Sequence, residues 1–373
     1  MRQENRLLVS SPFFPYREVK SYRPFLSCPT VLKLHVGSIV LYLGEKMIAL
    51  FSVAEYAPLG NGEREASMNN QRRASTTNSK QDTAKGSRLS PGLSGSFSIV
   101  AAVYLICYAI RLFEVLVLRT DQGILGEAFI QKVAGIIILV LVARLSGFKL
   151  REIGFAKKHA LRRVLLGLGI GLAVFVVAYS VEFMVLTSQG QSPTLEFYVS
   201  AYALAGSITG STTVFTIALC IVFNLINVLM EEGLFRGLFT RLGMRRVPFM
   251  TSNIIASLLF GLWHIALPIR SFIDGDMSAM GAFAYSSLLV STSFLMGFLL
   301  GMLTRMTGGI WASMGVHFVN NTIINLLHVS SLGGADELQM LRLTISQALA
   351  FSSVLIAYII WYRKQKQCFV SPV

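Results

Sequence analysis

Three short motifs place ionisable and amide side chains inside apolar stretches of the chain. They read Glu231-Glu232-x-x-x-Arg236, Phe260-x-x-x-His264 and His317-x-x-x-Asn321. Ionisable groups at membrane depth cost about 2.5–3.5 kcal/mol each on insertion scales, so they indicate function by default. Carboxylates and imidazoles are also the groups that activate water or hold a metal ion. The motifs therefore predict a hydrolytic site inside a membrane.

The two adjacent glutamates are expected to have different roles. Glu232 and Arg236 are four residues apart and share one face of a helix. A buried carboxylate needs a partner, so we expect these two side chains to form an orienting ion pair. Glu231 lies about 100° further round the helix. This direction makes Glu231 the candidate general base.

The other two motifs provide hydrogen-bond donors and an aromatic side chain. His317 and Asn321 are also four apart, so the imidazole and the amide face the same way. That arrangement suits donation to a developing oxyanion. Phe260 lies one turn before His264 and is expected to line the cavity.

The elements that carry these motifs are predicted to be transmembrane helices. The chain has 373 residues, of which 53% are hydrophobic and 14% charged, whereas soluble domains carry about 25% charged residues. Apolar runs of about 20 residues, enough to cross a bilayer as helices, recur from residue 97. We therefore predict an all-α polytopic protein with about eight transmembrane helices enclosing an intramembrane cavity. The expected spans are 96–118, 126–144, 163–187, 212–235, 248–268, 282–304, 308–328 and 341–362.

The basic residues indicate topology rather than nucleic-acid binding. The net charge is +14, but Lys and Arg gather in alternate connections between the spans. The positive-inside rule then places both termini in the cytoplasm of a multi-pass cell-membrane protein. Within the spans, Arg111 and Glu114 are expected to pair with each other, and Glu182 is expected to reach the outer interface.

Four segments are predicted along the chain. Residues 1–60 have no clear structural pattern, and the polar residues 61–95 read as a disordered linker. Residues 96–362 form the membrane domain that holds the motifs. Residues 363–373 form a basic cytoplasmic tail.

The three motifs, in this order on successive hydrophobic segments, resemble the CAAX protease and bacteriocin-processing (CPBP, or Abi) family of intramembrane endopeptidases. This family includes the type II CAAX prenyl endopeptidases. The resemblance implies an eight-helix core with a cavity open to the cytosol and to lipid. It implies that Glu231 and His264 activate the attacking water and that His317 and Asn321 stabilise the oxyanion. Glu232 and Arg236 would shape the site.

The resemblance also bears on substrates. Eukaryotic members cut prenylated CAAX proteins after the lipidated cysteine. Bacterial members are linked to bacteriocin maturation, immunity or signalling. The expected partners are therefore the lipid bilayer and a protein or peptide substrate, prenylated in the CAAX case.

The motifs leave open whether a metal ion takes part, and they leave two other functions open. Zinc would accept Glu231, His264 and His317 as ligands, but H-E-x-x-H is absent, and activation by Glu and His requires no cofactor. A non-catalytic immunity or scaffold protein is one alternative, although it has no reason to bear the insertion cost of these groups. A proton-coupled transporter is another, but no internal repeat is evident.

Overall fold

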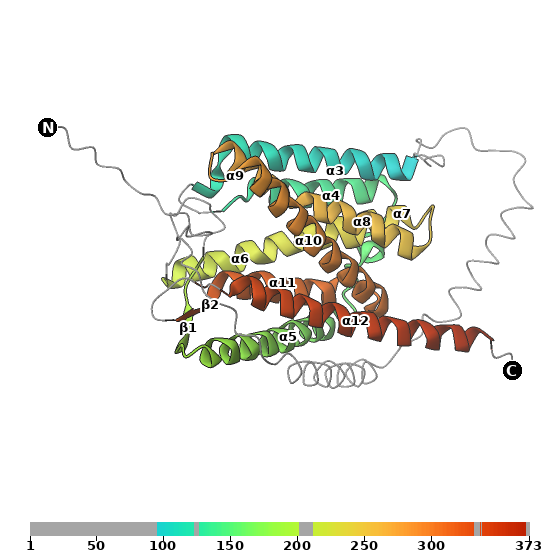
Figure 1. The fold of residues 1–373 in the computed structure, drawn as a ribbon. Helices are drawn as coiled ribbons and strands as arrows, with labels where there is room; N and C mark the ends of the chain where they lie inside the picture. The colour runs from blue at the N-terminus through green and yellow to red at the C-terminus, as the bar shows by residue number, and fades with distance from the viewer. Residues whose placement is uncertain (1–94, 123–126, 201–211, 332–335, 337, 371–373) are drawn as a thin grey trace, which may run out of the picture.

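The computed structural model describes residues 95–122, 127–200, 212–331, 336 and 338–370. The predicted segments 1–60 and 61–95 lie outside them, apart from Gly95. The described residues are mainly helical (Figure 1). The longer helices are α3 (Gly95–Phe113), α4 (Ile130–Leu145), α5 (Ala160–Ser188), α6 (Val214–Glu231), α8 (Phe249–Trp263), α10 (Ala279–Thr307), α11 (Trp311–Leu326) and α12 (Gln339–Val370).

Shorter elements join these helices. A π-helical turn, η1 (Glu114–Leu118), and a 3₁₀ turn, η2 (Thr120–Gln122), follow α3. A second 3₁₀ turn, η3 (Leu150–Ile153), precedes α5. The motif region contains the π-helix η4 (Glu232–Phe239), the short α7 (Thr240–Gly243) and α9 (Ala266–Ile273). Strands β1 (Pro193–Phe197) and β2 (Leu327–Ser331) pair antiparallel, with Pro193 opposite Ser331 and Phe197 opposite Leu327.

The all-α polytopic fold class is confirmed. Six helical segments of the described chain are long and apolar enough to cross a membrane: Gly95–Leu118, Ala160–Ser188, Val214–Gly243, Phe249–Ile273, Ala279–Thr307 and Gln339–Gln365. The other two predicted spans appear as α4 and α11, which have 16 residues each. At about 1.5 Å per residue each is roughly 24 Å long, shorter than a hydrocarbon core.

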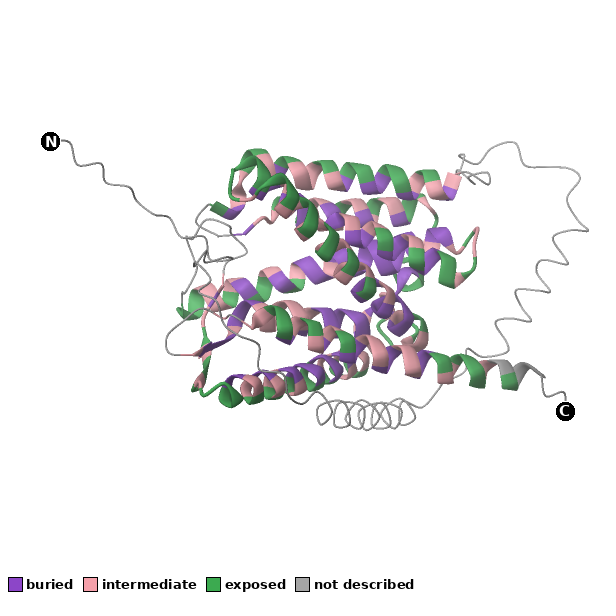
Figure 2. Ribbon diagram, in the orientation of Figure 1, coloured by how far each residue is buried: buried purple, intermediate pink, exposed green. Residues whose placement is uncertain are grey.

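The outward faces of the bundle are apolar. Figure 2 shows exposed residues along the outer sides of the helices and buried residues toward the middle. Large apolar side chains are exposed there, such as Leu105, Val176 and Phe283. An exposed apolar surface of this extent fits contact with lipid.

Two apolar cores support the motif-bearing helices. One lies among α5, α10, α11 and α12, and the other lies among α3, α4, η4 and α8. Helix α11 is held against α5 by glycines: a Cβ on Gly167 would lie 2.1 Å from the carbonyl oxygen of Ala312, and one on Gly315 would lie 2.6 Å from that of Val164. Small residues at such crossings let helix backbones approach closely. This contact fixes the position of α11, the helix that carries His317.

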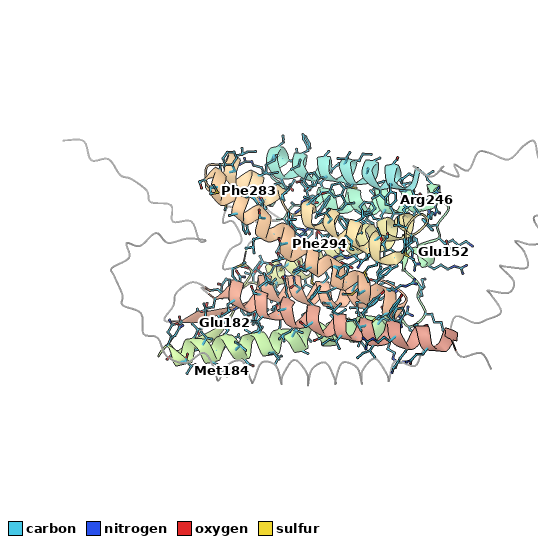
Figure 3. All side chains as sticks on the ribbon, turned by 45° about the vertical axis from the view of Figure 1, so that its right-hand side comes forward. Glu152, Glu182, Met184, Arg246, Phe283 and Phe294 are labelled. Carbon is cyan, nitrogen blue, oxygen red and sulfur yellow. The ribbon has the colours of Figure 1, made fainter. Side chains whose placement is uncertain are left out.

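The two ends of the bundle differ. Figure 3 shows Glu152 and Arg246 at one end and Glu182 toward the other. The basic connections after α4 and α7 lie at the first end, and the β1–β2 pair lies near the second (Figure 1).

The expected pairing of the two charges inside the first span is wrong. Glu114 does not pair with Arg111, because its carboxylate accepts hydrogen bonds from the backbone N–H groups of Ile130 and Gln131 and from the Thr120 hydroxyl. A carboxylate at a helix N-terminus satisfies otherwise unpaired N–H groups, here those of α4. The Arg111 guanidinium instead donates to Gln131 Oε1 at 3.0 Å.

Glu182 was also expected at the interface, and it is fully buried. Arg342 Nη1 lies 2.5 Å from Glu182 Oε2. The same guanidinium reaches Asp336, which in turn accepts a hydrogen bond from His328 Nδ1 at 3.2 Å. The His328 ring stacks on Tyr198, with the ring centroids 4.0 Å apart. This network ties α5, β2 and α12 together at the strand end of the bundle.

The network predicts a pH-dependent contribution of Asp336 to stability. Burial raises the pKa of the Asp336 carboxyl, but hydrogen bonds from His328 and Arg342 outweigh it and hold that pKa below its ordinary value of 3.8. The stabilisation is therefore present above that ordinary value and is lost as the pH falls through the lowered pKa. We expect Asp336→Asn to lower the free energy of unfolding by about 2–3 kcal/mol at pH 7.

The difference in the free energy of unfolding between Asp336→Asn and the wild type should narrow below pH 4. It is measured by unfolding both proteins in detergent from pH 3 to 7. Asp276→Asn, which changes an exposed aspartate, should have little effect at any pH. If the free energy of unfolding of Asp336→Asn were lower than that of the wild type by the same amount at every pH, this role for the carboxylate would be contradicted.

Candidate active site

The three motifs lie on three packed helices. The glutamates occupy the junction between α6 and η4, His264 follows the last residue of α8, and His317 lies in the middle of α11. The sequence predicted an ordinary helix through the first motif, whereas the structure widens into a π-helix from Glu232 onward. Such π-turns occur frequently at functional sites because they redirect side chains.

His317 lies between the two glutamates. Its Nδ1 is 2.8 Å from Glu232 Oε1, and its Nε2 is 3.5 Å from Glu231 Oε2. All three side chains are almost completely buried. One imidazole therefore connects the predicted base with the predicted supporting carboxylate.

Arg236 neutralises this acidic pair from one side. Its Nη1 lies 3.4 Å from Glu232 Oε1, so the predicted pair forms. The guanidinium also covers the ring of Phe260, with Cζ 3.9 Å from the ring centroid. A cation over an aromatic face gains additional attraction in a desolvated setting.

Phe260 is the centre against which both histidines pack. Its ring meets those of His264 and His317 nearly edge-on, at centroid distances of 4.8 and 5.8 Å. It also contacts the Arg236 guanidinium and the ring of Phe235. Phe260 thus sets the relative positions of three of the ionisable groups.

His264 lies at a break in its helix. The predicted span 248–268 is divided into α8 and α9 by residues 264–265. Pro268 explains the break, because a proline has no N–H to donate to the carbonyl four residues earlier and its ring crowds that carbonyl, here that of His264. His264 Nδ1 lies 2.8 Å from the Phe260 carbonyl oxygen. A carbonyl only accepts, so Nδ1 carries the proton, and Nε2 of the neutral ring holds a lone pair.

Glu231 has a partner that the motifs do not include. Trp263 Nε1 donates to Glu231 Oε1 at 3.0 Å, and both side chains are buried. The signal for this role in the sequence is weak, because a tryptophan beside an apolar motif is usually a packing residue. Its buried N–H nevertheless requires an acceptor.

Among the described residues, no hydrogen bond joins the Asn321 side chain to this cluster. Asn321 lies one turn after His317 on α11 and is half-buried. Its side-chain oxygen accepts from Asn320 Nδ2 at 3.2 Å. The structure therefore brings together six of the predicted site residues and leaves the seventh adjacent: Glu231, Glu232, Arg236, Phe260, His264 and His317, with Asn321 beside them.

The residues as arranged do not fit a resident metal ion. Both nitrogens of His317 face carboxylates, and His264 Nδ1 faces a backbone carbonyl. Within the described residues no three His, Cys, Asp or Glu side chains are grouped to hold a metal. Zinc usually takes three or four protein ligands, so no step of the chemistry below is assigned to a metal.

Two hollows in the described part of the chain lie away from these residues. One is lined by Phe183, Met184, Thr187 and Ser188 near the end of α5. The other lies among α5, α10, α11 and α12, with Asn320 on its wall. Neither is lined by Glu231, His264 or His317, so the predicted cavity around the motifs is not among them.

The cluster has the parts required for acid–base hydrolysis. It contains a buried carboxylate, Glu231, held by two side chains. The nearby His264 has an imidazole lone pair at Nε2. The charge of Glu232 is balanced by Arg236 within an apolar surround, where electrostatic interactions are stronger than in water.

Comparison with known proteins identifies the motif-bearing part of the chain. Residues 213–323 match the family model described as type II CAAX prenyl endopeptidase Rce1-like. The match begins just before α6 and ends within α11, so it includes all three motifs. No curated protein matches the chain.

The match agrees with the CPBP and CAAX protease resemblance seen in the motifs and supports CAAX-type endopeptidase activity in general. Together with the apolar helices it supports an integral membrane location and a peptide substrate. Over residues 213–323 the chain thus matches the Rce1-like type II CAAX prenyl endopeptidase family.

Proposed function

We propose that this protein is an intramembrane endopeptidase that cuts lipidated CAAX-type proteins with a water molecule activated by Glu231. The observation that carries the proposal is the position of the Glu231 carboxylate. It is buried in a membrane span between Trp263 Nε1 at 3.0 Å and His317 Nε2 at 3.5 Å.

The reaction begins with general-base catalysis. Glu231, assisted by the lone pair of His264 Nε2, takes a proton from water as the water oxygen attacks the scissile carbonyl carbon. The carbonyl π electrons move to oxygen and form a tetrahedral oxyanion. Collapse of this intermediate breaks the C–N bond, and the proton held by Glu231 passes to the leaving amine.

Oxyanion stabilisation comes from α11. His317 donates through Nε2 when its ring is protonated, and Asn321 supplies an amide N–H from the next turn. Glu232 stabilises the protonated imidazole through Nδ1, at 2.8 Å. Arg236 keeps Glu232 ionised by pairing with it at 3.4 Å.

The proposed orientation places both chain termini in the cytoplasm. Support comes from the basic connections, which gather at the end of the bundle marked by Arg246 in Figure 3. Lys and Arg in short loops favour the cytoplasmic side. CAAX proteins carry their lipidated C-termini on that side.

The test compares the wild type with Glu231→Gln at equal abundance in native-like membranes. New protein termini are identified by mass spectrometry, with a farnesylated CAAX peptide added as probe. We expect cleavage of the probe after its lipidated cysteine only with the wild type, and no loss of cleavage with a strong chelator. Cleavage that a chelator abolishes would contradict the metal-independent mechanism. The absence of any Glu231-dependent terminus would contradict the protease.

A further inference from the structure

A second cationic group lies beside the candidate active site and outside the three motifs. Arg111 is on α3, within the first membrane span, and is half-buried. Its guanidinium covers the ring of Trp263, with Cζ 4.9 Å from the ring centroid. Trp263 is the residue that donates to Glu231. Residues 213–323, which match the family model, do not include α3.

The charge of Arg111 has no carboxylate of the described residues within ion-pair distance. Its only described hydrogen bond is the one that Nη1 donates to Gln131 Oε1, and Glu114, three residues away, is occupied by the N-terminus of α4. The buried Nε–H of Arg111 has no hydrogen-bond acceptor in the described part of the chain. A cation in a membrane span normally pairs with an anion or a carbonyl.

Tyr108 adds a second donor on the same face of α3, one turn earlier. Its ring stacks on Tyr104 at 5.7 Å between centroids and lies 5.9 Å from the Trp263 ring. Its buried hydroxyl also has no hydrogen-bond partner among the described side chains and backbone. Leaving such groups unpaired costs about 1–3 kcal/mol each. The Tyr108 hydroxyl and the Arg111 Nε–H therefore form a pair of donors that lacks an acceptor in the described part of the chain.

The chemistry of this group suits a carboxylate. Guanidinium N–H groups in a planar fork match the two oxygens of a carboxylate, and a phenol hydroxyl can donate a further bond. A neutral peptide carbonyl would use only part of this donor set.

The distance from Glu231 fits a particular carboxylate. Trp263 contacts Glu231 through Nε1 and Arg111 through its ring face, so the guanidinium and the Glu231 carboxylate lie on the order of 10 Å apart at most. A CAAX-type substrate has three residues after its lipidated cysteine. Three extended residues span about 10–11 Å, so a chain that ends three residues after the scissile bond is long enough for its carboxylate to reach this group.

We propose that Tyr108 and Arg111 form a subsite that binds the C-terminal carboxylate of the substrate. The inference rests on the proposed endopeptidase function. The subsite binds the free end of the segment that is removed. A peptide bond is therefore cut only when the chain terminus lies about three residues beyond it. Internal segments of the same sequence lack the carboxylate and are poor substrates.

The test uses two farnesylated CAAX peptides that differ only at the C-terminus, one a free acid and the other an amide. The kcat/KM of each is measured with the wild type, Arg111→Gln, Arg111→Lys and Tyr108→Phe in the same lipid nanodiscs. The wild type should prefer the acid by about 10- to 100-fold, the range of a charge-assisted hydrogen-bonded pair. Arg111→Gln should lose the preference and cut the acid and the amide at similar rates, and Arg111→Lys should keep part of the preference. Tyr108→Phe should lower the rate on the acid more than that on the amide.

Arg305→Gln is the matched control. Arg305 also contacts an aromatic ring, that of Phe249 at 5.4 Å, but at the far end of α8 from His264. This variant should keep the full acid preference. If Arg111→Gln lowered kcat/KM by the same factor for the acid and the amide, the subsite would be overturned and Arg111 would be a positioning residue for Trp263. An unchanged preference in Arg111→Gln would overturn it as well.

A binding measurement tests the subsite independently of peptide cleavage. The fluorescently labelled acid and amide peptides are titrated into Glu231→Gln and into Glu231→Gln combined with Arg111→Gln. Tighter binding of the acid that disappears in the double variant supports the subsite even if the wild type cleaves neither peptide. Failure of cleavage alone then contradicts the endopeptidase, and equal binding of acid and amide contradicts the subsite.

Discussion

Glu231→Gln should lower kcat by about 10³-fold or more and leave the fold intact. General-base catalysis contributes about 10²- to 10⁴-fold, and the amide of glutamine cannot take a proton from water. The substituted side chain keeps the shape of glutamate, and its oxygen still accepts from Trp263 Nε1. The measurement is the initial rate of cleavage of a farnesylated CAAX peptide in nanodiscs, with the melting temperature determined on the same samples.

Glu152→Gln is the matched control for Glu231→Gln. Glu152 is an exposed glutamate at the end of the bundle that Figure 3 shows beside Arg246. Its substitution removes the same charge without touching the cluster, so the rate should not change. If Glu231→Gln retained more than about a tenth of the wild-type rate, another group would have to be the base.

Arg236→Met should have the largest effect on stability, with a loss of about 3–5 kcal/mol. Removing one partner of a buried ion pair leaves an uncompensated charge. Here that charge is Glu232, which is fully buried and next to Glu231. The cation–π contact with Phe260 is lost at the same time. Chemical or thermal unfolding in detergent, scaled to the wild type, measures the loss.

A double variant separates stability from catalysis at the same position. Glu232→Gln combined with Arg236→Met removes both charges, and the free energy of unfolding should recover by about 2 kcal/mol or more relative to Arg236→Met alone. Activity should stay low, because His317 Nδ1 then has no carboxylate to stabilise its protonated form. Arg151→Met, at an exposed arginine, should match the wild type in both measurements. A double variant with full activity would show that the ion pair serves stability alone.

The fold and the site differ in how far local patterns could predict them. The long apolar runs predicted six spans that the structure contains, because hydropathy and helical rise depend on nearby residues alone. The same reasoning gave α4 and α11 as spans, although each has only 16 residues. Helix α11 is mostly buried by its neighbours. An apolar run does not distinguish contact with lipid from contact with other helices.

Individual charged residues show the limit of spacing arguments. Glu232 and Arg236 pair as their four-residue spacing predicts. Arg111 and Glu114, three apart, do not, because a helix N-terminus from α4 takes the carboxylate. Glu182 pairs with Arg342, which is 160 residues away in the sequence. Neighbouring charges pair only when no better donor approaches from elsewhere in the fold.

The sequence by itself determined that this is a helical membrane protein with glutamates, histidines and an arginine inside its spans, and it placed them in an order that resembles one family. The break at His264 was not predicted, because residues 248–268 were expected to form one span. Only the tertiary structure decided that His317 joins the two glutamates, that Trp263 holds Glu231 and that Arg111 lies beside that tryptophan. The physical reason is that spacing fixes the face of a helix on which a side chain lies, whereas the packing of several helices decides what that face meets.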